Sequence, residues 1–245
     1  MFYFDNFYGK KVLKSTLLKD YDCFFTTREF VLTPASLSEL EKEAEQNRLF
    51  LKEKLNCSEI STAKQVHGTN IEIIKDNKYF YDNTDALVSN IPSSLMLLNY
   101  ADCVPLILYA KKADTGAVIH AGWRGTADEI AFKTTKKLTE EFNINPEDIT
   151  ALIGPAIGKC CFETDEDVFD KIVKDKNKND LYNKKGEKYY IDLKLVNKYQ
   201  LEKAGIKNID ICNYCTCCMS DIFFSYRKEN GKTARHSAVV KIKGK

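Results

Sequence analysis

Apolar residues recur at helical spacing between Leu37 and Leu55, where charged residues fill most of the other positions. This pattern predicts an amphipathic helix whose apolar face carries Leu40, Ala44, Arg48, Leu51 and Leu55. An arginine on that face indicates either an internal anion or substrate group nearby, or a side chain that lays its stem along the edge of the core and keeps its charge in water.

Short apolar runs bounded by turn residues follow one another in the middle of the chain, which is typical of strands. We expect strands at residues 71–75, 86–89, 95–99, 104–110, 116–120 and 149–153. Two more strands are expected to pair near the end of the chain, at residues 223–226 and 237–243. The lysine- and asparagine-rich stretch at residues 174–188 is expected to form a solvated loop or a boundary between two lobes.

Three further helices are predicted from their capping residues and apolar spacing. The first begins at Thr126, which forms a capping box with Glu129, and continues to Phe142. The others span residues 165–175 and residues 192–204. Because many strands follow one another without an intervening helix, this order predicts an α/β protein of the α+β type, with a mixed, largely antiparallel sheet core covered by helices. The length of 245 residues is consistent with a single domain over residues 1–245.

Composition and charge narrow the possible partners. Hydrophobic residues make up 44% and charged residues 29% of the chain, as in ordinary folded proteins. The net charge is only +2 and lysines alternate with acidic residues, so we expect no nucleic-acid partner. The N-terminus lacks the pattern of a secretion signal and no apolar run reaches membrane-spanning length, which predicts a cytoplasmic protein without a membrane partner. Because the cytoplasm is reducing, the nine cysteines are expected to be core residues, metal ligands or nucleophiles rather than disulfides.

Two of the three histidines and one cysteine occupy strand ends beside turns. His67 lies in Gln65-Val-His-Gly68, Cys103 in Ala101-Asp-Cys-Val-Pro105, and His120 in His120-Ala-Gly-Trp-Arg-Gly125. Two imidazoles and one thiolate form a complete ligand set for catalytic zinc, which keeps a fourth position open. The alternative from the residues alone is a pair of hydrogen-bonded histidines and a small buried cysteine.

Five motifs, in this order, closely resemble those of the YfiH-like laccase-domain family, also called the purine nucleoside phosphorylase or polyphenol oxidoreductase family. They are the three just named, Ile153-Gly-Pro-Ala-Ile-Gly-Lys-Cys-Cys-Phe-Glu163 and Phe223-Phe-Ser-Tyr-Arg227. The resemblance spans residues 28–245 and implies a YfiH-like fold with zinc bound by His67, Cys103 and His120. It also implies phosphorolysis of adenosine, inosine, guanosine and methylthioadenosine, and deamination of adenosine. Ala156 and the Thr233-Ala-Arg235 segment depart from the family pattern near the expected substrate mouth.

Roles for the site residues follow from this resemblance and from side-chain chemistry. Arg48 and Arg124 are the first and second choices for binding phosphate, because a guanidinium matches phosphate oxygens, and Arg227 and Arg235 are assigned structural roles. Gln65 is assigned to substrate binding. The catalytic set is Cys103, His120, Arg48 and Asp102. In a regular strand Asp102 would point away from Cys103, unless the chain bends near Pro105.

Three alternatives to a zinc phosphorylase are open. A copper-dependent polyphenol oxidoreductase would need more imidazoles than His67, His120 and His236 provide. A cysteine hydrolase would use Cys103 as nucleophile and His120 as base. A partner-binding protein would keep the zinc as a structural ion. The Cys212 to Cys215 spacing, with further cysteines at 160, 161, 217 and 218, is typical of a second metal site or an iron-sulfur cluster. Buried thiols are favoured instead, because Cys160 and Cys161 are adjacent rather than spaced as a second pair. The sequence does not fix the oligomeric state.

Overall fold

The computed structural model describes residues 1–76, 79–175, 178 and 180–244. Within these residues, a seven-stranded sheet has the order β1-β2-β3-β16-β8-β4-β6. Its strands are β1 (Phe2–Phe7), β2 (Lys10–Ser15), β3 (Cys23–Thr26), β16 (His236–Lys241), β8 (Leu95–Tyr100), β4 (Ile60–Ala63) and β6 (Phe80–Tyr81). Neighbouring strands are antiparallel except where β4 pairs with β8 and with β6.

A six-stranded sheet of the same described residues has the order β15-β11-β9-β10-β7-β5. Its strands are β15 (Asn208–Ile211), β11 (Ile149–Ile153), β9 (Val104–Ala110), β10 (Thr115–Ala121), β7 (Ala86–Ser89) and β5 (Ile71–Ile73). The β15–β11 and β5–β7 pairs are parallel, whereas the pairs in the middle of the sheet are antiparallel. The expected mixed, largely antiparallel architecture is therefore confirmed.

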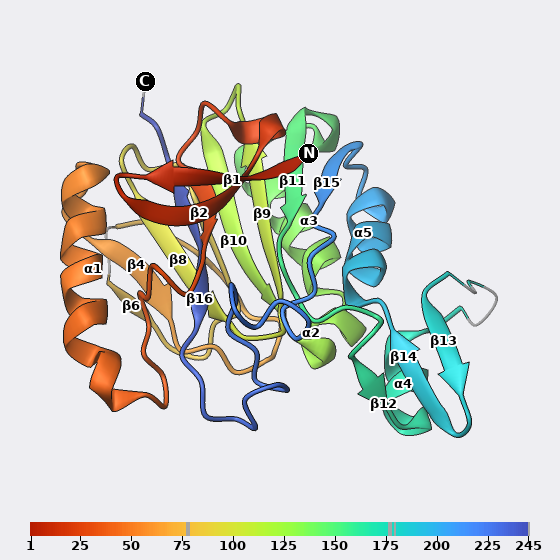
Figure 1. Cartoon of the computed structure of the whole chain (residues 1–245). Helices are drawn as coiled ribbons and strands as arrows, with labels where there is room; N and C mark the ends of the chain where they lie inside the picture. Colours follow the sequence, from red (N-terminus) through yellow and green to blue (C-terminus); the bar gives the residue numbers. More distant parts are fainter. Residues whose placement is uncertain (77–78, 176–177, 179, 245) are drawn as a thin grey trace.

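Helices cover the outer faces of the two sheets (Figure 1). The helices that do so are α1 (Glu41–Lys54), α3 (Ile130–Phe142) and α5 (Leu193–Lys203). The short helix α2 (Trp123–Ala127) follows β10, and α4 (Glu166–Ile172) lies beside a small third sheet (Figure 1). Short 3-10 turns occur at η1 (Thr16–Leu18), η2 (Ser38–Leu40) and η3 (Pro146–Asp148). Helix α1 lies on one side of the molecule, and α3 and α5 lie on the other (Figure 1). The result is a four-layer arrangement of helix, sheet, sheet and helices.

The layers are held together by side chains that alternate along the strands. In β8, Leu95 and Leu97 pack with Leu51 of α1, whereas Met96 and Leu98 pack against the other sheet. A separate cluster joins the outer face of the six-stranded sheet to α3 and α5. Because both faces of these strands are covered, the central strands are continuous apolar runs, which is why the sequence revealed them.

A small three-stranded sheet projects from the body of the molecule together with α4 (Figure 1). Its strands are β12 (Glu163–Thr164), β14 (Lys188–Ile191) and β13 (Tyr182–Lys185). The expected solvated loop at 174–188 is therefore wrong from Tyr182 onward, because a turn at Gly186, with φ of +60°, joins β13 to β14. Residues 176, 177 and 179 of that expected loop lie outside the described residues.

Two other predicted elements need correction. The helix expected at 126–142 is two helices, α2 and α3, because Glu129 between them has a left-handed backbone with φ of +61°. Thr126 lies inside α2 and does not cap a helix. The strand expected at 223–226 is irregular, and β16 pairs instead with β3 and β8. The apolar run there reflects burial of Phe223 in the core between the sheets.

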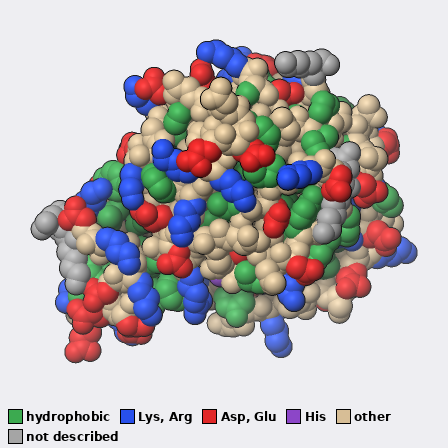
Figure 2. All heavy atoms as spheres, turned by 180° about the vertical axis from the view of Figure 1, so that it is seen from behind, with side chains coloured by type: hydrophobic (Ala, Val, Ile, Leu, Met, Phe, Trp, Pro, Cys, Tyr) green, Lys and Arg blue, Asp and Glu red, His purple; other side chains and the backbone are tan. Residues whose placement is uncertain are grey.

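The surface agrees with the modest net charge of the sequence. Figure 2 shows lysine, arginine and acidic side chains interspersed over one face of the molecule, without a broad patch of either sign. None of the helices in the described residues combines the length and the apolar character that crossing a lipid bilayer requires.

Candidate active site

Three strand ends bring His67, Cys103 and His120 together. His67 follows β4, Cys103 lies between β8 and β9, and His120 lies near the end of β10. One ligand atom from each residue falls within 4.8 Å of the others. Zinc bonds to nitrogen and sulfur are about 2.0–2.3 Å long, so tetrahedral ligands lie under about 4 Å apart. The three ligand atoms are therefore gathered closely enough to be candidate ligands of one ion.

The buried carboxylate of Asp85 supports two of these residues. Asp85 is completely buried, and its Oδ1 accepts a hydrogen bond of 2.7 Å from Nδ1 of His120. The same carboxylate accepts backbone N–H bonds from Val66, His67 and Gly68, at 3.2, 3.0 and 2.8 Å. A carboxylate on one imidazole nitrogen fixes the ring and leaves the other nitrogen for a metal.

Asp85 was missed in the sequence analysis. The signal is an acidic residue directly before the buried strand β7, where an unpaired carboxylate would be costly. Such a residue needs several donors, and here the turn around His67 supplies them.

The turn after β10 passes close to the three ligands because it contains Gly122. A Cβ atom added at Gly122 would lie 2.7 Å from Cδ2 of His67 and 3.3 Å from Sγ of Cys103. The first distance is shorter than any ordinary contact, so a side chain at this position would displace His67. His67 itself adopts a left-handed backbone with φ of +62°, an uncommon conformation for a residue other than glycine.

Cys103 and His120 form a charged pair when no metal is bound. Burial raises the pKa of the Cys103 thiol, but the charge and hydrogen bonds of the two histidines outweigh it and lower that pKa to about 6. Burial likewise lowers the pKa of His120, whereas the Cys103 thiolate and Asp85 raise it to about 9. The donor set is therefore an anionic sulfur with two imidazoles, which fits zinc with a fourth position for water or substrate.

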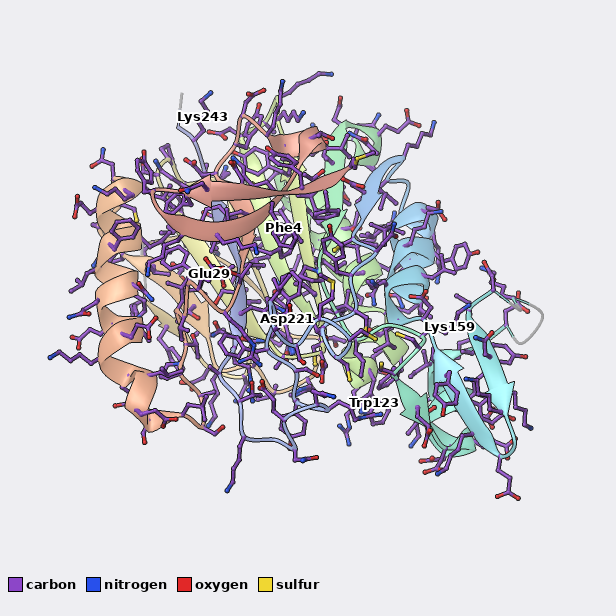
Figure 3. The ribbon with its side chains drawn as sticks, in the orientation of Figure 1. Phe4, Glu29, Trp123, Lys159, Asp221 and Lys243 are labelled. Carbon is purple, nitrogen blue, oxygen red and sulfur yellow. The ribbon has the colours of Figure 1, made fainter. Side chains whose placement is uncertain are left out.

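Two cavities meet at Cys103. A polar cavity of about 490 Å³ is lined by Thr33, Ala35, Gln65, His67, Asn99, Ala101, Cys103, His120, Tyr226 and Arg235. A more apolar cavity of about 150 Å³ is lined by Ala101, Asp102, Cys103, Trp123, Ile157, Phe162, Leu193, Tyr226 and Arg227. Figure 3 shows Trp123 at the edge of the body, beside the small sheet. A molecule with an apolar part and a polar part could occupy both cavities and pass Cys103.

The sequence-predicted substrate residues lie at different distances from this centre. Gln65 lines the polar cavity, and its amide exchanges two hydrogen bonds, of 2.7 and 2.9 Å, with the backbone of Asn99. Arg48 lies in a neighbouring cavity, which shares Thr33 and Asn99 with the polar cavity, and Nη1 donates to the carbonyl of Leu32 at 2.7 Å. Gln65 therefore lines the same cavity as the trio, whereas Arg48 lines the adjacent cavity.

Arg124 and Asp102 are used in other contacts. The exposed Arg124 guanidinium stacks on Trp123 at 4.2 Å and does not line either cavity at Cys103. The backbone of Asp102 is left-handed, with φ of +81°, and its carboxylate accepts hydrogen bonds from Thr216 Oγ1 at 2.6 Å and from the Arg227 N–H at 2.7 Å. Asp102 thus fixes the turn that presents Cys103.

Arg235 and Tyr226 are cavity residues to which the sequence analysis gave no substrate role. Arg235 lines the polar cavity together with the trio, and Nη1 is held by the carbonyls of Thr233 and Ala234. Tyr226 is 56% exposed and borders both cavities. Both residues belong to motifs visible in the sequence, but only the fold shows that the end of the chain returns to Cys103.

Residues 35–243 match the family described as multi-copper polyphenol oxidoreductase laccase, and the chain belongs to this family. It is 32% identical to a purine nucleoside phosphorylase of Bacteroides thetaiotaomicron, over 86% of this chain and 88% of that protein. It is also 32% identical to a purine nucleoside phosphorylase of Clostridium acetobutylicum, over 92% of this chain and 94% of that protein.

The fold matches that of a solved structure, the hypothetical protein YfiH of Bacillus licheniformis. The TM-score is 0.88 and the identity is 28%, with 98% of each chain covered. The family and the YfiH-like fold inferred from the five motifs are thus confirmed.

Proposed function

We propose that this protein is a zinc-dependent purine nucleoside phosphorylase, which cleaves a purine nucleoside with phosphate to the free base and a sugar 1-phosphate. The observation that carries this proposal is the Asp85-supported trio of His67, Cys103 and His120 at the junction of a polar and an apolar cavity. The names of the two relatives, both purine nucleoside phosphorylases, support the reaction class.

The two cavities suit the two parts of a nucleoside. Trp123, Phe162 and Tyr226 surround the apolar cavity with aromatic rings suited to a flat base. The polar cavity offers Arg235 for a phosphate group, because a guanidinium matches phosphate oxygens. Arg48, the first choice for binding phosphate in the sequence analysis, would provide a further phosphate contact across Thr33 and Asn99 from the trio.

His67, Cys103 and His120 would hold the zinc, and zinc supplies a Lewis acid and lowers the pKa of a bound water. Asp85 holds the proton on Nδ1 of His120, so that Nε2 is the nitrogen that would bind the ion once it has lost its own proton. Asp102 keeps the turn at Cys103 in place through Thr216 and Arg227. We include adenosine deamination in the proposal, because it needs an activated water beside a purine ring.

The test incubates the protein with adenosine, inosine, guanosine and methylthioadenosine, with and without phosphate, and identifies products by mass. We expect bases and sugar 1-phosphates only when phosphate is present, and inosine with ammonia from adenosine in its absence. Cys103→Ala should abolish both reactions while the circular dichroism spectrum stays unchanged. Full activity of Cys103→Ala would refute the metal mechanism.

The same assay with varied phosphate compares the two arginines. Arg235→Gln should raise the KM for phosphate about tenfold or more, because a hydrogen bond to a charged group contributes about 1.5–3 kcal/mol. Arg48→Ala should also weaken phosphorolysis, and Arg124→Ala is the exposed control. An unchanged KM in Arg235→Gln would remove Arg235 from the phosphate site.

The charged pair of Cys103 and His120 favours one second candidate, a cysteine hydrolase with Cys103 as nucleophile. Chelation of zinc distinguishes the two functions. The activity of a cysteine hydrolase would persist without zinc, whereas that of a zinc phosphorylase would be lost. The copper chemistry in the family description fits less well, because two of three histidines are in the trio and His236 is completely buried. Stoichiometric copper with phenol turnover would reverse this judgement.

A further inference from the structure

A second group of metal-ligating side chains lies outside the active-site trio. Strands β11 and β15 run parallel, and the loops after them continue side by side, with an isolated bridge between Ala156 and Cys215. The N–H of Thr216 donates to the carbonyl of Ala156 at 3.1 Å. Each loop carries two cysteines to the same place, and together they form the four-cysteine cluster: Cys160, Cys161, Cys215 and Cys218.

The sulfur atoms of the four-cysteine cluster are spaced as ligands of one ion. Sγ of Cys218 lies 3.5 Å from Sγ of Cys160 and 3.4 Å from Sγ of Cys161, and all four atoms lie within 4.8 Å of one another. A tetrahedral ion with bonds of about 2.3 Å to sulfur holds its ligands about 3.8 Å apart. A disulfide needs about 2.05 Å. An iron-sulfur cluster spreads its cysteines over several iron atoms, so this tight set fits a single ion better.

The backbone around the four-cysteine cluster comes close to its sulfur atoms and donates to one of them. The N–H of Gly158 donates to Sγ of Cys215 at 3.1 Å. A Cβ atom added at Gly158 would lie 3.2 Å from both Sγ of Cys160 and Cβ of Cys215, so glycine permits this close approach.

We propose that the four-cysteine cluster binds a second metal ion, a structural zinc or similar thiophilic divalent cation, separate from the active-site zinc. Four protein ligands fill the tetrahedral coordination of zinc and leave no position for substrate, as in structural sites. Binding replaces thiol protons by the ion and involves no oxidation.

The structure revises the cysteine spacing considered in the sequence analysis. The loop after β15 contributes Cys215 and Cys218, which have the Cys-x-x-Cys spacing. Cys212 is completely buried and is not part of the four-cysteine cluster. Cys160 and Cys218 are exposed, so these two are not the buried core thiols expected from the sequence. Adjacent Cys160 and Cys161 both contribute because the chain turns sharply there, with the N–H of Cys161 bonded to the carbonyl of Gly158.

The four-cysteine cluster also joins loops that reach the active site. Thr216, between two of its cysteines, donates to Asp102, and Nη1 of Arg227 donates to the carbonyl of Cys161 at 2.9 Å. Lys159, labelled in Figure 3, lies where the chain leaves the body toward the small sheet. The ion would therefore fasten both loops beneath the turn that carries Cys103, without lining the cavities there.

The test counts zinc in the full-length protein after zinc loading and gel filtration. Wild type should hold about two ions per chain and His120→Ala about one. The double variant Cys161→Ser/Cys218→Ser should also hold about one, in its active site. Cys57→Ser, which changes a half-buried cysteine far from both groups, is the matched control and should keep about two. In His120→Ala, cobalt should give the strong sulfur-to-metal absorption of a tetrahedral four-thiolate site.

Alkylation of wild-type protein tests the site without any substitution. Zinc should protect all four cysteines of the cluster from iodoacetamide, chelation should expose them, and Cys57 should react equally in both states. Zinc-free His120→Ala, equal alkylation of the cluster with and without zinc, or disulfides within it under reducing conditions would each overturn the proposal. Loss of nucleoside cleavage alone would overturn the proposed function and leave these readouts unchanged.

Discussion

The trio of His67, Cys103 and His120 and the four-cysteine cluster are supported by the chain in opposite ways. The trio mixes nitrogen with sulfur, is held by the buried carboxylate of Asp85, and borders a cavity of about 490 Å³. The four-cysteine cluster has only sulfur ligands, is held by backbone N–H groups, and lines neither cavity at Cys103. Chemistry needs an open coordination position beside a cavity, whereas fastening two loops needs a filled one. The comparison thus fits the catalytic role that we propose for the trio and the structural role that we propose for the four-cysteine cluster.

The largest expected effect is that of pH on zinc affinity. Between about pH 6 and 9 a zinc ion must displace a proton from His120, whose pKa is about 9, while Cys103, with a pKa of about 6, is already a thiolate. Affinity of the trio should rise about tenfold per pH unit, or about a thousandfold across this window. Below about pH 6, Cys103 is protonated as well, and the dependence should steepen.

The four-cysteine cluster should show a steeper dependence near neutral pH. Burial and neighbouring thiols raise the pKa of Cys160 to about 11 and also raise that of Cys161, so both must lose a proton when an ion binds. Competition with a colorimetric zinc chelator measures each site alone, in Cys161→Ser/Cys218→Ser and in His120→Ala. If zinc affinity changed with pH equally at the two sites, the predicted difference between them would be wrong.

The next largest effect is expected from Asp85→Asn. The amide keeps the size of the side chain but cannot accept on both sides from His120 and three backbone N–H groups. Loss of such a carboxylate behind a metal-binding histidine typically costs 10–100-fold in metal affinity or activity. Zinc competition should show this loss at the trio and none at the four-cysteine cluster. The exposed Asp82→Asn is the control, and an equal loss in both variants would contradict the role of Asp85.

Much of the fold could be predicted because the central strands are covered on both faces. The strands at 86–89, 104–110 and 149–153 have the predicted bounds, since buried strands are unbroken apolar runs between turns. Strands β1 and β2 were not anticipated: they are only partly buried and carry polar residues at several positions. The run at 223–226 shows the converse error, since apolar residues there are buried without pairing.

The sequence was enough to predict which three residues form the trio, but not which other residues surround them in space. His67, Cys103 and His120 stood at strand ends, where metal ligands commonly occur, and the structure brings them together. Asp85 and Arg235 could not be assigned in the same way, because their roles depend on contacts with residues far away in the chain. The four-cysteine cluster needed the parallel pairing of β11 with β15, which no local pattern in the loops reveals.

The smallest expected effect tests whether the two groups are connected. Thr216 is completely buried between the cysteines of one loop, and its hydroxyl donates to Asp102, which sets the turn at Cys103. Thr216→Val keeps the shape and the backbone bond to Ala156 but removes one donor to the Asp102 carboxylate and leaves, among the described residues, the N–H of Arg227. We expect the free energy of unfolding to fall by about 1.5–3 kcal/mol, the usual contribution of a hydrogen bond to a charged group.

Activity should respond less than stability in Thr216→Val, because the remaining bond from Arg227 still holds Asp102. A fall of roughly tenfold or less in kcat/KM is expected, with metal content unchanged, since a partly supported turn still presents Cys103. Thr135→Val is the matched control: Thr135 is also completely buried, but its hydroxyl donates to the carbonyl of Ala131 within α3 and takes no part in either group. If both variants lose the same activity, the hydrogen bond from Thr216 to Asp102 does not couple the four-cysteine cluster to the trio. The cluster would then stabilise its loops independently of catalysis.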